Sequence, residues 1–217
     1  MYYSQNNQDK YLEENIFKGY KNGFFVEVGA NDGVYISNTL YFENNNNWSG
    51  INIEPIKSLY DRLVINRPKC INYNCAIYSS EGEKEFICND GYTEPLSGIK
   101  DTYDARHFQR LNKENILTNS KTKLINVNTK KLETIFDENN IKHVNYLSID
   151  VEGAEFAVIK SINFDKIFID VISFENNYND VTIPIIKYLE EKNYKLINTN
   201  HDIMMINKDS VFTPFTI

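Results

Sequence analysis

The fold of this chain is decided by the stretch Phe24-Phe25-Val26-Glu27-Val28-Gly29-Ala30-Asn31-Asp32-Gly33. Its apolar first half predicts a strand covered on both faces, as the first strand of a parallel α/β sheet must be. Gly29 and Gly33 allow backbone conformations and close approaches that a side chain would block, and we expect a helix to follow at once over 34–42. The free N–H groups at such a helix start would face a ligand. The turn therefore predicts a small-molecule site.

The spacing of the turn favours one class of ligand. A dinucleotide-binding turn has the pattern Gly-x-Gly-x-x-Gly, and Asn31 stands where the middle glycine would be. Glu27 would repel a pyrophosphate and attract an ammonium group. An acid followed by Gly29 and Gly33 looks like the first motif of S-adenosylmethionine (SAM) dependent methyltransferases, which implies that Glu27 lies near the methionyl amino group. A turn that only connects strand to helix is the alternative.

A second acid follows at a matching position. Glu54 ends a short predicted strand over 50–54, at the tip where a carboxylate can accept both ribose hydroxyls of a bound nucleoside. A surface glutamate at a strand end, with Pro55 making the turn, is the plainer interpretation. The two acids together favour a nucleoside-containing cofactor. The strand predicted over 70–78 would place Cys75 and Ala76 beside its adenine.

Length and charge narrow the functional class. The 217 residues fit one domain, 1–217, with an N-terminal helix over about 8–20 and an irregular insertion or lid over about 89–120. A net charge of −7 argues against nucleic acid or an anionic membrane as a partner. Three cysteines without a Cys-x-x-Cys pair indicate a reducing compartment. With neither a signal peptide nor a membrane-spanning run, we expect a soluble cytoplasmic protein.

A cluster of acids follows a second buried strand. Asp150, Glu152 and Glu155 come directly after the apolar run 144–149, so they should lie at the carboxyl edge of the sheet, where such folds bind ligands. One of them could accept a proton from an acceptor hydroxyl, and two could hold a divalent ion. The alternative is that Glu152 and Glu155 only stabilise a helix N-terminus.

Other candidates for the acceptor side lie further along the chain. Glu175 ends the fifth predicted core strand, and His201 lies in the loop of a closing antiparallel pair, where it could act as a base. In the insertion, residues 96–98 should point inward. Arg106, His107 and Arg110 could meet an anionic or hydroxyl-rich acceptor, although a solvated helix face is the simpler interpretation. The three histidines show no metal-ligand spacing, so no metal ligand is assigned.

Taken together, these segments resemble the FkbM family of SAM-dependent methyltransferases. The resemblance rests on Ser4-Gln5 to Asp9, residues 25–33, Ser37-Asn38-Thr39, Ile53-Glu54-Pro55 and residues 147–155. It implies a class I methyltransferase (Rossmann-like) fold, an α/β fold whose seven-stranded, mostly parallel sheet has helices on both faces. It also implies O-methylation of a sugar, glycan or small-metabolite hydroxyl. Many members carry Lys at the position of Ser148, so any role of that lysine does not transfer.

These interpretations give a defined set of expected site residues. The cofactor S-adenosyl-L-methionine is expected to contact Gln5, Glu27, Gly29, Ala30, Asn31, Gly33, Asn38, Glu54, Pro55, Cys75, Ala76 and Asp150. The catalytic or acceptor-binding candidates are Asp150, Glu152, Glu175 and His201. Two other functions stay open: a nicotinamide or nucleotide-sugar oxidoreductase on a similar fold, and a non-catalytic SAM-fold module that binds carbohydrate.

Overall fold

The computed structural model describes residues 1–198 and 202–212, and they form a mixed α/β fold around a seven-stranded sheet. The strand order is β10-β11-β9-β8-β1-β2-β3. Neighbours from β9 to β3 pair in parallel, whereas β11 pairs antiparallel with both β9 and β10. The chain leaves β1 for β2 on one side and returns to β8 on the other, so the order reverses at β1.

The elements of this sheet and its helices follow in chain order. The strands are β1 (Phe24–Val28), β2 (Ser49–Ile53), β3 (Ile71–Tyr73), β8 (His143–Ile149), β9 (Phe168–Glu175), β10 (Tyr194–Asn198) and β11 (Asp202–Asn207). The helices are α1 (Gln8–Leu12), a π-helical turn η1 (Glu13–Phe17), α2 (Leu40–Asn46), α3 (Lys57–Asn66), α5 (Leu132–Glu138), α6 (Glu155–Lys160) and α7 (Asn179–Glu191).

Both faces of the sheet are buried, which explains why its central strands read as continuous apolar runs. Side chains alternate along β1, so Val26 and Val28 pack on the face that α5, α6 and α7 cover. Phe25 points to the other face, where it joins residues of α1, η1 and α2. On that face Phe17 packs edge-on against Trp48. The hydrophobic core thus has two layers, one on each side of β1.

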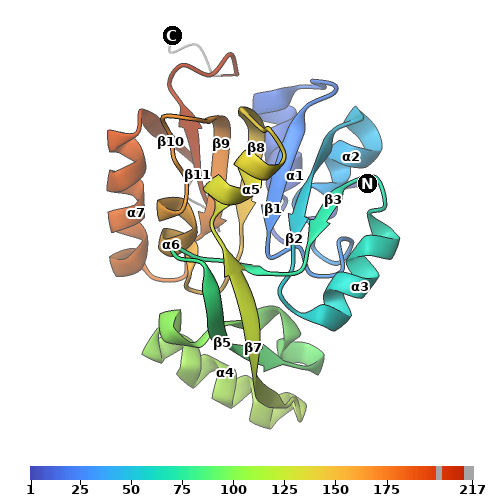
Figure 1. The fold of residues 1–217 in the computed structure, drawn as a ribbon, viewed down its shortest axis with the longest axis vertical. Coiled ribbons are helices and arrows are strands. Elements are labelled where there is room, and N and C mark those ends of the chain that lie inside the picture. The colour runs from blue at the N-terminus through green and yellow to red at the C-terminus, as the bar shows by residue number, and fades with distance from the viewer. Residues whose placement is uncertain (199–201, 213–217) are drawn as a thin grey trace.

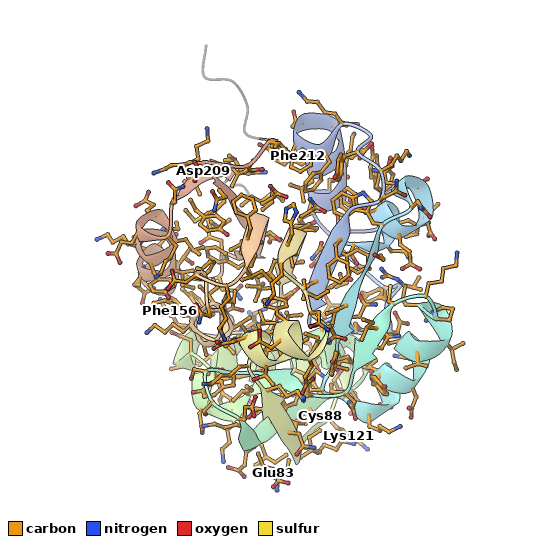
Figure 2. The ribbon with its side chains drawn as sticks, turned by 45° about the horizontal axis from the view of Figure 1, so that its top comes forward. Glu83, Cys88, Lys121, Phe156, Asp209 and Phe212 are labelled. Carbon is orange, nitrogen blue, oxygen red and sulfur yellow. The ribbon has the colours of Figure 1, made fainter. Side chains whose placement is uncertain are left out.

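A second, four-stranded sheet is inserted between β3 and α5. Its order is β4-β7-β5-β6, and with α4 it lies below the large sheet in Figure 1. Glu83 and Cys88 of β5 lie at one end of the molecule in Figure 2, and Phe212 lies at the opposite end. The elements are β4 (Ala76–Ile77), β5 (Gly82–Asn89), η2 (Gly91–Leu96), β6 (Gly98–Ile99), η3 (Lys100–Thr102), α4 (Ala105–Thr118) and β7 (Thr122–Lys130).

Two predicted elements are wrong. The helix expected directly after Gly33 begins only at Leu40, because residues 34–39 form a loop that the Glu27 carboxylate holds. The single strand expected over 70–78 is two short strands, β3 in the large sheet and β4 in the small one. The chain therefore passes from one sheet to the other at Asn74 and Cys75.

None of the helices in the described part of the chain is both long and apolar enough to cross a membrane.

Candidate functional site

A cavity opens at the carboxyl edge of the large sheet, at the point where the strand order reverses. It has about 840 Å³ of unfilled space, part of which is open to solvent. Ligands of open α/β sheets bind at such a reversal. Ten of the twelve expected cofactor residues line it: Glu27, Gly29, Ala30, Asn31, Asn38, Glu54, Pro55, Cys75, Ala76 and Asp150.

Two expected cofactor residues do not line this cavity. Gln5 is exposed in the bend before α1, outside the cavity lining. Gly33 has a φ of +80°, and a Cβ built on it would lie 2.6 Å from atoms of both Leu63 and Arg67. This glycine therefore permits close packing against α3 and its C-terminal end rather than contact with a ligand.

Gly29 brings the ends of two strands together. Its φ is +87°, and a Cβ at this position would lie only 1.8 Å from the carbonyl oxygen of Asp150. The Asp150 N–H donates to the carbonyl of Val28 over 3.0 Å, which fixes the end of β8 against β1. Only a residue without a side chain allows this approach. The glycine thereby places the Asp150 carboxylate at the cavity wall.

Glu54 is a buried carboxylate at the tip of β2. It accepts the backbone N–H of Asn31 over 3.0 Å and that of Ile56 over 2.7 Å, one on each oxygen. Burial raises its pKa to about 8 although both hydrogen bonds favour the charged form. Each oxygen keeps a further lone pair, so the group can accept two more donors from a ligand. That is the requirement for holding a vicinal diol.

Glu27 is buried and bound to the loop that replaces the expected helix start. Its carboxylate accepts the hydroxyl of Ser37 over 2.9 Å, the N–H of Asn38 over 2.7 Å and the hydroxyl of Thr39 over 2.6 Å. The guanidinium of Arg67 lies 3.7 Å away. Burial outweighs these contacts, so the pKa of Glu27 is raised. Glu27 thus both lines the cavity and anchors the 37–39 loop.

Asn38 presents an acceptor without a donor beside Glu27. Its amide nitrogen donates to the Ser148 hydroxyl over 3.0 Å, whereas its Oδ1 is buried and has no hydrogen-bond partner among the described residues. A buried acceptor left unpaired costs about 1–3 kcal/mol. Because Asn38 lines the cavity, an amino group of a ligand there would satisfy this oxygen.

The inserted sheet closes the cavity from the other side. Sequence analysis placed Cys75 and Ala76 there and expected residues 96–98 to point inward, yet Phe86 and Ile99 also line the cavity. Their positions depend on how the small sheet packs, a tertiary contact that no local pattern records. Of the inward segment expected at 96–98, Ser97 lines this cavity, whereas the Leu96 side chain packs with Ile87 and Leu111. The aromatic and aliphatic side chains give this part of the cavity an apolar wall.

A cluster of three carboxylates stands between this cavity and a second one. Oxygens of Asp150, Glu152 and Glu175 lie within 4.8 Å of one another. Asp150 lines the first cavity, whereas Glu152 and Glu175 line the second, which has about 530 Å³ of unfilled space. Burial and the neighbouring carboxylates raise the pKa of Asp150 and Glu152, and they raise that of Glu175 to about 7. Three of the four expected catalytic residues are thus close together; His201 lies outside the described residues.

His107, which sequence analysis named only as a possible contact of the acceptor, lies beside this cluster. The ring is buried, and its Nε2 lies 3.3 Å from Oε2 of Glu152. The expected solvated face is therefore wrong for this residue of α4. The one local signal was its spacing from Leu111, because residues four apart share a helix face and both are buried here. Its neighbour Arg106 points elsewhere, to Asp104 and Asp180.

Comparison with known proteins agrees with this architecture. The sequence profile of the methyltransferase FkbM domain matches residues 27–196. The crystal structure of methyltransferase FkbM from Methylobacillus flagellatus KT is similar, with a TM-score of 0.52 and 10% identity over 87% of this chain. The chain spans 44% of the length of that protein. These similarities to solved structures concern the fold alone.

A second solved structure gives a weaker match. The precorrin-6y C5,15-methyltransferase from Geobacter metallireducens GS-15 has a TM-score of 0.48 and 9% identity, covering 93% of this chain and 86% of that one. Comparison with curated protein sequences gives no match. The family profile, however, covers most of the chain and confirms the resemblance seen in its motifs. The chain belongs to the FkbM methyltransferase family.

Proposed function

We propose that this protein is a SAM-dependent O-methyltransferase with a class I fold that methylates a hydroxyl of a sugar, a glycan or a small metabolite. Membership of the family supports methyl transfer. The observation that carries the proposal is one cavity lined both by a buried carboxylate with free lone pairs, Glu54, and by a buried acceptor without a donor, Asn38 Oδ1. A ribose and an α-amino group on the same molecule would satisfy both.

The residues of the first cavity match the parts of SAM. Glu54 would accept the ribose hydroxyls, while Asn38 Oδ1 and the carboxylate of Glu27 would accept the methionyl ammonium. Phe86 and Ile99 offer the adenine an apolar wall near Ala76. Bound SAM supplies an electrophilic methyl group. A nicotinamide dinucleotide fits less well, because Glu27 places a carboxylate at the turn where a pyrophosphate would lie, and Asn31 replaces the middle glycine of a dinucleotide-binding turn.

The acceptor belongs in the second cavity. Methyl transfer is an in-line displacement, so the protein mainly has to align the nucleophile with the methyl group and take its proton. The carboxylate cluster lies between the two cavities, the position where that proton is released. Asp150, which lines the first cavity, and Glu152 and Glu175, which line the second, would receive the proton and orient the hydroxyl.

Two measurements test this function. Isothermal calorimetry with S-adenosylhomocysteine (SAH) should show one site per chain, and NAD should not compete for it. Mass spectrometry of a panel of polyols and sugars incubated with the protein and SAM should then show the gain of one methyl group. Tighter binding of NAD than of SAH would reject the proposal in favour of an oxidoreductase. Binding of SAH together with a carbohydrate, without methylation of that carbohydrate, would favour the non-catalytic module.

A further inference from the structure

We propose that Asp150, Glu152, Glu175 and His107 form a binding site for one divalent metal ion. The site follows from geometry alone and does not depend on the function proposed above.

The carboxylates have the separation that one ion requires. Their nearest oxygens all lie within 4.8 Å of one another. Ligands on opposite sides of an ion at metal–oxygen distances of about 2.1–2.4 Å are about 4–5 Å apart. A single ion can therefore contact all three side chains.

The sheet fixes two of these ligands side by side. Ile149 of β8 is the register partner of Phe174 of β9, so Asp150 and Glu175 are the next residues on two paired strands. Glu152 reaches the same point from the loop after β8, where its φ is +54°. Three carboxyl groups thus converge where no neighbouring strand separates them.

His107 supplies the independent observation. Its ring is only 3% exposed. Within the part of the chain that the structure describes, neither the His107 Nε2 atom nor the Glu152 Oε2 atom that it faces at 3.3 Å has a hydrogen-bond partner. A cation bound by both atoms would satisfy them. Their separation is close to the roughly 3 Å between adjacent ligands of one ion.

The inserted segment holds this histidine in place. A Cβ on Gly153 would lie 2.6 Å from the carbonyl oxygen of Thr102, so the loop after β8 packs directly against the segment that leads into α4. At the start of α4, Arg106 donates to Asp180 of α7 through two bonds of 3.0 Å. His107 lies on α4 of the inserted segment, and these contacts fix its position relative to the carboxylates at the edge of the large sheet.

The ligand set indicates the class of ion. Three carboxylates and one imidazole suit a divalent ion that accepts both oxygen and nitrogen, such as Mn²⁺ or Fe²⁺, better than Ca²⁺. The second cavity adjoins Glu152 and Glu175, so remaining coordination positions would face it. If the proposed methyl transfer holds, those positions could bind an acceptor hydroxyl.

The test uses Mn²⁺ as the probe. Calorimetry on the full chain at neutral pH, with the free-Mn²⁺ electron paramagnetic resonance signal as a second readout, should show one ion per chain. Glu152→Gln and His107→Gln should each weaken binding at least tenfold. Glu54→Gln is the matched control, because Glu54 is 4% exposed and Glu152 6%, yet Glu54 lies outside the cluster. Absence of Mn²⁺ binding, or equal loss in the control, would overturn the proposal.

A second measurement does not require a folded variant. Electron spin echo modulation of Mn²⁺ bound to the wild-type protein should show a directly coordinated imidazole nitrogen, and bound Mn²⁺ without this coupling would remove His107 from the site. SAH binding separates the two proposals. Glu152→Gln should lose Mn²⁺ and keep SAH, whereas Mn²⁺ binding by a wild-type protein that fails to bind SAH would reject the cofactor assignment alone.

Discussion

Replacing Glu54 with Gln should change how the stability of the protein depends on pH. Glu54 is 4% exposed, and burial raises its pKa from 4.5 to about 8. Between these values the folded state binds the proton more strongly than the unfolded state does. The free energy of unfolding of the wild type should therefore fall as the pH rises through this window. Gln does not titrate, so the variant lacks this contribution.

The size of the effect follows from linkage. A pKa raised from 4.5 to about 8 corresponds to at most about 5 kcal/mol, because one pKa unit is worth about 1.4 kcal/mol. The full difference is reached only above pH 8. Gln can accept one of the two backbone N–H groups and not the second, which costs about 1–3 kcal/mol at every pH. This cost is the same at every pH, so only the pH dependence of the difference in unfolding free energy measures the titration of the Glu54 carboxylate.

Urea unfolding of both proteins at pH 5, 6.5 and 8 measures this slope. The free energy of unfolding of Glu54→Gln minus that of the wild type should grow with pH, by at least about 2 kcal/mol over the series. Asp150, Glu152 and Glu175 are present in both proteins, so their titration largely cancels. A difference that stays constant from pH 5 to pH 8 would refute the argument that burial dominates the pKa of Glu54.

Three further predictions follow from the same contacts. Gly29→Ala should lower the free energy of unfolding by about 3 kcal/mol or more, because its Cβ would overlap the Asp150 carbonyl, and unchanged urea unfolding would contradict this. Arg67→Met should cost about 3–5 kcal/mol because it removes the cation from the buried Glu27 and from Glu43, which is 12% exposed, whereas the control Arg62→Met, at an exposed residue of α3, should cost less than about 1 kcal/mol. SAH affinity should rise with pH below pH 8, by up to about tenfold per pH unit, because Glu54 must ionise to accept two hydroxyls. In calorimetry at several pH values, Glu54→Gln should lose this pH dependence. A wild-type protein whose SAH affinity does not change with pH would disprove the role of Glu54 in binding the ribose.

The sequence was sufficient for features that depend on local pattern. The strand over 24–28 is observed as predicted, because a run of apolar residues before a glycine turn suits a strand buried on both faces. Glu54, Asp150 and Glu152 are at the sheet edge as predicted, because strand ends can be read from where the apolar runs stop. These local patterns located the first cavity, at the end of β1, and the carboxylate cluster.

Features that depend on contacts distant in sequence could not be predicted. The 34–39 loop is not a helix because Glu27, ten residues or more away, accepts the donors that a helix start would otherwise leave free. The burial of His107 depends on α4 packing against the loop after β8, which only the fold of the inserted sheet brings about. Asn38 was expected to contact the cofactor on the resemblance to the FkbM family alone. That its Oδ1 is unpaired among the described residues could be seen only in the structure.

A crystal structure of the protein with SAH is the most direct test of the central claim. We predict that SAH occupies the cavity at the end of β1, with both ribose hydroxyls within hydrogen-bond distance of the Glu54 carboxylate and the amino group beside Asn38 Oδ1. A cavity that stays vacant at saturating SAH, or a ligand bound away from both residues, would contradict the assignment.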